Sequence, residues 1–93
     1  MNNKELSESK RVLKWPVGLP GGAPDIVGGG PIAHVAEGFV WTIEPQGSTR
    51  EWRKVRVYGT GDPVPADAVH IGTMMMGPFV WHAFEVTDDE EPI

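Results

Sequence analysis

The chain has 93 residues, with eight Lys and Arg residues against thirteen Asp and Glu residues, and it has no cysteine. This length suits one domain with one core, and the lack of cysteine excludes disulfides and thiolate-held zinc or iron–sulfur sites. No apolar run reaches the ~18 residues of a transmembrane helix, and the start of the chain lacks the apolar segment of a signal peptide. We therefore expect a cytoplasmic protein with no membrane partner.

Negative charge is concentrated at the C-terminus. Residues 88–93 hold four carboxylates, and residues 1–10 balance two Lys against two Glu. The remainder carries six basic and seven acidic groups. We predict a disordered tail over 1–10, a single β domain over 11–87 and a disordered acidic tail over 88–93. A nearly neutral domain lacks the broad basic face that duplex nucleic acid requires.

Twelve Gly and nine Pro interrupt the sequence and leave no room for a long helix. Short stretches rich in β-branched and aromatic residues lie between them and predict strands over 11–15, 32–36, 39–44, 52–58, 70–75 and 79–86. Residues 17–31, with six of the glycines, are expected to form a long irregular loop. The fold class is thus all-β, a small antiparallel barrel or sandwich of about six strands.

Two hairpins follow from this pattern. The first joins 39–44 to 52–58, and the second joins 70–75 to 79–86 through Met76-Gly77-Pro78. The proline-rich segment 62–67 connects them, because proline cannot donate to a central ladder. Strand alternation and apolar-to-apolar pairing predict a core that contains Phe39, Trp41, Ile43, Val55 and Val57.

The same alternation places Trp52, Lys54, Arg56 and Tyr58 on the opposite face. Half of the Lys and Arg residues lie within 50–56. Cationic side chains bind phosphate oxygens, and aromatic rings stack on bases. The row is the candidate ligand site, and the alternative is an ordinary solvated strand face. Gly59, Thr60 and Gly61 follow, either as an anion-binding nest or as a simple turn.

The last strand is apolar on both faces, so both faces should be covered. The cover is either the 17–31 loop or a second subunit, and we favour a homo-oligomer. The interface residues expected are Met75, Phe79, Trp81 and Phe84.

The other polar residues do not predict catalysis. His34, His70 and His82 lie on three separate strands with no metal-ligand spacing, and Glu37, Glu44, Glu51 and Glu85 show no acid–base pairing. We predict no metal, no cofactor and no catalytic residue.

The strings VLKWPV, VWTIEP, RVYGTGDPVP, HIGT and VWHAFEV, spread over residues 12–86, resemble a family of short phage and prophage proteins of undefined function. Asp62 departs from that pattern, because the family often has His after the GTG turn. The resemblance implies a phage accessory protein. Small phage proteins of this type often counter host defence, some by sequestering nucleotide signals.

Three functional hypotheses result. The first is non-catalytic sequestration of a small anionic nucleotide, either a cyclic dinucleotide or an ADP-ribose-type signal. The second is a protein-interaction module that docks on a host or phage protein, suggested by the last strand and the run Met74–Met76. The third, a hydrolase of the same nucleotides that uses histidine, has the least support.

Overall fold

The computed structural model describes residues 9–46 and 51–87. The C-terminal tail, residues 1–8 of the N-terminal tail, and residues 47–50 between two strands lie outside the described residues. The described residues form seven strands: β1 (Lys10–Pro16), β2 (Asp25–Gly28), β3 (Ile32–Ala36), β4 (Phe39–Pro45), β5 (Trp52–Gly59), β6 (Val69–Met76) and β7 (Phe79–Val86).

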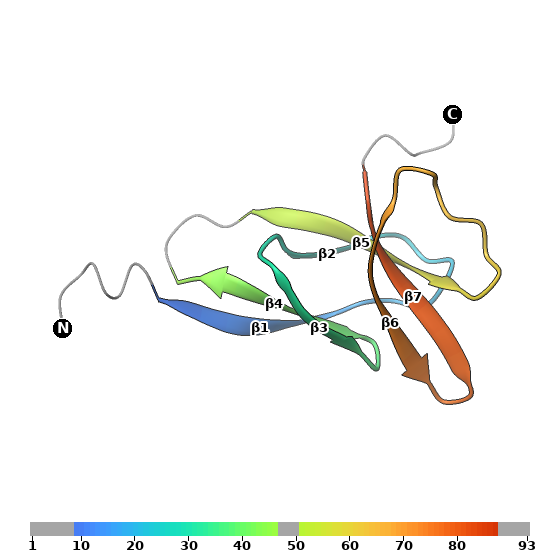
Figure 1. Cartoon of the computed structure of the whole chain (residues 1–93), viewed down its shortest axis with the longest axis horizontal. Coiled ribbons are helices and arrows are strands. Elements are labelled where there is room, and N and C mark those ends of the chain that lie inside the picture. The colour runs from blue at the N-terminus through green and yellow to red at the C-terminus, as the bar shows by residue number, and fades with distance from the viewer. Residues whose placement is uncertain (1–8, 47–50, 88–93) are drawn as a thin grey trace.

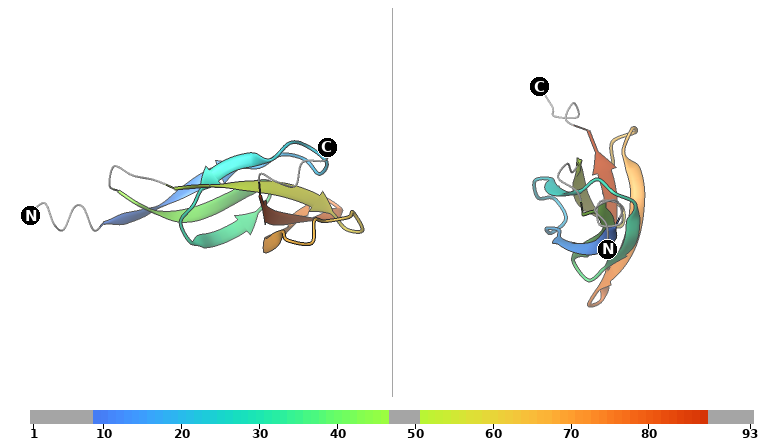
Figure 2. Two further views of the ribbon diagram at one scale, coloured as in Figure 1. Left: turned by 90° about the horizontal axis from the view of Figure 1, so that it is seen from above. Right: turned by 90° about the vertical axis from the view of Figure 1, so that its left-hand side faces the viewer.

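The strands form two antiparallel sheets (Figure 1). The three-stranded sheet has the order β1-β4-β3, and the four-stranded sheet has the order β2-β5-β7-β6. Figure 2 shows the two sheets as separate layers, so the arrangement resembles a sandwich and does not close into a barrel. The predicted all-β class is confirmed. Over the described residues, no helix is long and apolar enough to cross a membrane.

One of the two predicted hairpins is correct. β6 and β7 pair from Met76↔Phe79 onward, and Gly77 at the turn has φ of 61°. That conformation suits the first central position of a type II′ turn, which favours glycine. The predicted pairing of β4 with β5 is wrong, because the two strands belong to different sheets. β4 instead lies between β1 and β3.

The predicted loop 17–31 contains a seventh strand. β2 pairs with β5 through Asp25↔Val55, Ile26↔Lys54, Val27↔Arg53 and Gly28↔Trp52. This strand has only four residues and is flanked by glycines and prolines. Such a composition is typical of a loop, so the sequence pattern does not predict the strand. Asp25 also accepts a hydrogen bond from the amide of Gly18 at 2.7 Å, which ties the preceding turn to this strand.

The core lies between the sheets. Val27, Val55 and Ala83 are fully buried and pack against Trp15 and Val35 of the three-stranded sheet, with Val17 and Ile71 beside them. Burying a valine in this way stabilises the fold by roughly 1.5–3 kcal/mol. The inward orientation of Val55 and Val57, which are 0% and 2% exposed, is as predicted.

The predicted orientation of β4 is inverted. Val40, Thr42 and Glu44 are buried, whereas Phe39, Trp41 and Ile43 are half-exposed on the other face. Polar side chains can occupy an interior when their hydrogen bonds are satisfied. Here Thr42 receives a hydrogen bond from Trp15 and donates one to Glu44. On the outer side, the ammonium of Lys14 lies 4.1 Å from the ring centroid of Phe39.

Candidate functional site

The row of aromatic and cationic residues predicted on β5 does not act as one unit. Its members are Trp52, Lys54, Arg56 and Tyr58. Trp52 is 55% exposed, and its ring lies edge-on to that of Trp15 at 5.5 Å. This contact directs Trp52 toward the three-stranded sheet. Tyr58, at the other end, is only 8% exposed and packs edge-on against Phe84 of β7 at 5.6 Å.

Lys54 and Arg56 lie between these two aromatic residues and are half-buried. The register pairs Lys54 with Val86 and Arg56 with Phe84. On the far side of β7, Phe84 pairs with His70 of β6. Adjacent strands lie about 4.8 Å apart, so His70 stands roughly two strand spacings from Arg56 on the same face.

The next row across the sheet joins Tyr58, His82 and Thr73. We call the two rows together the basic face. It consists of Lys54, Arg56, Tyr58, His70, Thr73, His82 and Phe84. None of these strand positions is acidic, because Asp25 and Glu85 pair with Val55 and share its face. The basic face therefore combines two permanent cations, two imidazoles and two aromatic rings.

A chain of hydrogen bonds orders the polar half of this face. Thr60 Oγ1 donates to the carbonyl oxygen of Val80 at 3.2 Å and lies 2.9 Å from His82 Nε2. Thr73 Oγ1 lies 3.0 Å from His82 Nδ1 and 3.0 Å from His70 Nε2. Two threonine hydroxyls thus engage both ring nitrogens of His82.

The donor directions in this chain can be assigned from one bond. Because the hydroxyl hydrogen of Thr60 points to Val80, Thr60 accepts from His82 Nε2–H. A neutral ring then carries no hydrogen on Nδ1, which accepts from the hydroxyl of Thr73. Thr73 in turn accepts from His70 Nε2–H. Neutral His82 therefore has no ring nitrogen left for a substrate.

The glycine-flanked turn is closed by its own carboxylate. Asp62 Oδ2 accepts from the amide of Gly59 at 2.8 Å, and the amide of Asp62 donates to the carbonyl of Gly59 at 3.1 Å. Gly61 has φ of 96°, which favours glycine. The amide of Gly59 is already bound to an anion within the chain, so Gly59, Thr60 and Gly61 form a turn here. Asp62 caps this turn.

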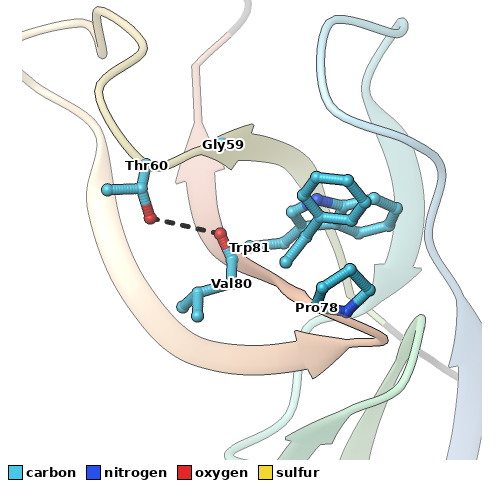
Figure 3. A pocket seen from close by; sticks show the side chains of 6 residues that line it. Gly59, Thr60, Pro78, Val80 and Trp81 are labelled. Carbon is cyan, nitrogen blue, oxygen red and sulfur yellow. Dashed lines mark hydrogen bonds between the residues drawn. The ribbon is translucent and has the colours of Figure 1, made fainter.

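A hollow of about 400 Å³ opens where β5 ends beside β7 (Figure 3). It is lined by Gly59, Thr60, Pro78, Phe79, Val80 and Trp81. Gly59 pairs with Trp81, the last pair between these strands, so β7 continues past β5. The hollow brings together two predicted ligand residues, Gly59 and Thr60, and two predicted interface residues, Phe79 and Trp81.

The four predicted interface residues are divided between the faces of the four-stranded sheet. Met75 and Phe84 share the side of the basic face, whereas Phe79 and Trp81 lie on the other side. Met75 and Phe79 are each 61% exposed, and Trp81 and Phe84 are half-buried. Ala83 and Val86, on opposite faces of β7, are buried within the single chain. Thr60 ties one end of segment 60–68 to β7 through the Val80 carbonyl. Near its other end, Asp67 accepts a hydrogen bond at 3.4 Å from Thr87, the residue that follows β7.

Sequence reasoning missed the convergence of His70 and His82, whose ring centroids lie 6.3 Å apart. The signal was available in the turn, since pairing Met76 with Phe79 and counting back sets Thr73 opposite His82. His34 lies elsewhere, with its ring 5.2 Å from that of Trp41 in the other sheet. Across the described residues, no group of three or more histidine and acidic side chains is placed to hold a metal ion.

Sequence reasoning also missed the buried carboxylate of Glu44. Its Oε2 accepts from Thr42 at 2.5 Å and from the amide of Gly30 at 3.0 Å, and its side chain is 1% exposed. A hollow of about 280 Å³ beside it is lined by Gly29, Gly30, Glu44, Pro45 and Glu51. Thr42 lies two residues from Glu44 on the same strand, but Gly30 is 14 residues away in the sequence.

Comparison with known proteins identifies a family and no activity. No significant match was found to a curated protein or to a solved structure. A family model described as a domain of unknown function, DUF7352, matches residues 8–93 and so includes both sheets and the basic face. The chain therefore belongs to the DUF7352 family, a domain of unknown function.

Proposed function

We propose that the protein binds and sequesters a small anionic nucleotide on the basic face, without altering it chemically. The ligand class is a cyclic dinucleotide or an ADP-ribose-type signal. The observation that carries the proposal is the alignment of Arg56 with Phe84 and His70 across three strands, next to Lys54, at positions free of carboxylates.

The chemistry of these side chains suits phosphate and base together. The guanidinium of Arg56 offers paired donors to phosphate oxygens, and Lys54 adds a second positive charge. Phe84 stands between Tyr58 and His70, with ring centroids at 5.6 and 5.1 Å. Stacking of a base on an aromatic ring contributes about 1–3 kcal/mol. Trp52, held by Trp15, is a peripheral contact in this proposal.

The proposal favours binding over hydrolysis because of how His82 is held. A general base needs a nitrogen lone pair within reach of the substrate. In the neutral ring both nitrogens of His82 are engaged by Thr60 and Thr73. Using His82 as a base would first break one of these bonds, so a hydrolase that depends on His82 is the weaker alternative.

The biological setting that we propose rests on the sequence resemblance to short phage proteins. In this setting the protein is a phage accessory product that acts in the cytoplasm of the host cell and withholds a nucleotide signal from host defence. Sequestration requires no catalytic group. The residues of the basic face therefore need only bind the nucleotide.

A nucleotide panel tests the proposal. Thermal unfolding is followed with cyclic dinucleotides, ADP-ribose and inorganic phosphate, and binding at 100 times Kd should add about 2.7 kcal/mol of apparent stability. Arg56→Ala and Arg56→Gln should lose the shift while keeping the native circular dichroism, and Arg11→Ala serves as a cationic control. Chromatography after denaturation should recover the ligand intact. No shift with any nucleotide, or recovery of a cleaved product, contradicts the proposal.

A protein-interaction module is the second candidate, and one observation favours it. Phe79 is 61% exposed at the rim of the hollow lined by Pro78 and Trp81. Large exposed apolar side chains beside a hollow are typical of binding surfaces. Affinity capture from infected cells with wild type, Phe79→Asp and Arg56→Ala separates the candidates. If Phe79→Asp loses a partner that wild type and Arg56→Ala both capture, the result supports the interaction module. If neither variant loses a partner, the interaction module is rejected.

A further inference from the structure

The two sheets have four edge strands, and three of them are protected against pairing with another chain. β1 carries Lys10, Arg11 and Lys14 and ends at Pro16, β2 has four residues, and β3 has five residues and a register shift. Charged residues, proline, bulges and short length are the features by which proteins protect exposed edges.

β6 has little of this protection. It spans eight residues, VHIGTMMM, with no Lys, Arg, Asp, Glu or Pro. Its register shift lies between His70 and Gly72, so Gly72–Met76 is regular. Val69 and Met75 are 58% and 61% exposed. This is a long, uncharged edge with exposed apolar side chains.

Among the residues that the structure describes, none pairs with the backbone on the outer side of β6. β6 pairs only with β7, and no backbone hydrogen bond joins it to another element within the described ranges. β3 packs on the face of β6 and not along its edge. A Cβ placed on Gly72 would come within 2.6 Å of Val35 Cβ, which shows how closely the two strands are stacked.

We propose that a second copy of this chain pairs antiparallel with β6, edge to edge, about a two-fold axis through its regular part, Gly72–Met76. A strand without charge can pair with itself because no like charges are brought opposite one another. Pairing would satisfy the open backbone groups and cover Met75. A domain of this size also gains much from self-association, because its own core is small.

Such pairing would join two four-stranded sheets into one of eight strands. Thr73 and His70 of each copy lie on the basic face next to the joined edge, so the two basic faces would become continuous. The Thr73 side chains of the two copies would then lie near the axis on the joined basic face. The assembled face would span enough length for a ligand with two phosphate groups.

The mass in solution tests the pairing without any ligand. Sedimentation or light scattering should give about twice the chain mass of 10.2 kDa for wild type. Met75→Lys should give a monomer, because lysine on an edge strand opposes pairing. Val12→Lys is the matched control: Val12 is 55% exposed on β1 in the other sheet, and this variant should stay dimeric. Circular dichroism and thermal unfolding establish that each variant is folded.

A single cysteine provides an independent measurement. Because the chain has no cysteine, Thr73→Cys introduces one thiol near the proposed axis, and mild oxidation should link two copies. Val12→Cys should remain unlinked. A monomeric wild type at every soluble concentration overturns the proposal. So does a dimer that persists in Met75→Lys and fails to cross-link through Thr73→Cys. Arg56→Ala should remain dimeric, so loss of ligand binding and loss of pairing can be distinguished.

Discussion

Gly28 and the carboxylate of Glu44 lie so close together that no larger side chain fits at residue 28. A Cβ built on Gly28 would overlap Glu44 Oε2 and lie 3.0 Å from Thr42 Oγ1. Gly30 is equally constrained, by the carbonyl oxygen of Ile43. Glycine at residues 28 and 30 is therefore explained by close packing, against the Glu44 carboxylate in the first case and the Ile43 carbonyl in the second.

Gly28→Ala should destabilise the protein by about 1–3 kcal/mol, the range in which overpacking of a core falls. Urea unfolding followed by tryptophan fluorescence measures the change. The control is the double variant with Glu44→Ala, which removes the obstructing carboxylate. Since the two residues touch, the double variant should be more stable than the sum of the single effects predicts. Additive effects would show that Gly28 is required for another reason.

Thr42→Val should cost on the order of 2 kcal/mol in unfolding free energy. The substitution keeps the shape of the side chain but leaves Trp15 Nε1–H without its acceptor and removes one of the two donors to Glu44 Oε2. Unsatisfied buried groups of this kind cost about 1–3 kcal/mol. Thr42→Ser keeps the hydroxyl and should lose less. Equal stability of the Val and Ser variants would show that the hydroxyl contributes nothing.

Tyr58→Phe should leave the stability unchanged or raise it. The Tyr58 hydroxyl is buried and has no hydrogen-bond partner within the described residues, so its removal relieves a desolvation cost. The ring contact with Phe84 is preserved. Thr42→Val is the reference variant. It removes a hydroxyl that is hydrogen-bonded, so it should lower the free energy of unfolding. A loss above about 1 kcal/mol would imply that the Tyr58 hydroxyl has a partner in solution.

Asp62→Ala should lower the midpoint of thermal unfolding by removing about 1 kcal/mol of stability, a typical value for one hydrogen bond. The carboxylate holds the Gly59 amide at 2.8 Å. Asp62→Asn retains an acceptor oxygen and should behave nearly as wild type. Asp67→Ala, which removes only a 3.4 Å contact with Thr87, should have a smaller effect. Equal losses at the two positions would assign the effect to charge and not to the turn.

The sequence predicts what depends on neighbours along the chain. The β6–β7 hairpin follows from Gly77-Pro78, and the inward direction of Val55 and Val57 follows from alternation. The orientation of β4 does not follow from alternation, because two groups that make Glu44 and Thr42 acceptable in the interior are far away in sequence. Gly30 is 14 residues distant, and Trp15 is 27 residues from Thr42.

The candidate site is predictable to the same degree. Lys54, Arg56 and Tyr58 come from one strand, so alternation finds them. His70, His82 and Phe84 join them only once β7 is known to pair with β5 as well as β6. The separation of Trp52 from the row depends on Trp15, 37 residues earlier in the chain, and no local pattern indicates that contact.

The passage from β4 to β5 between the two sheets has a consequence for biosynthesis. The three-stranded sheet possesses all its strands once Pro45 has left the ribosome, whereas β2 waits for Trp52–Val55 to appear. During that interval β2 has no strand to pair with. The inner face of the three-stranded sheet is also not yet covered by the second sheet. Elongation at about 5–20 residues per second makes this stage last on the order of a second.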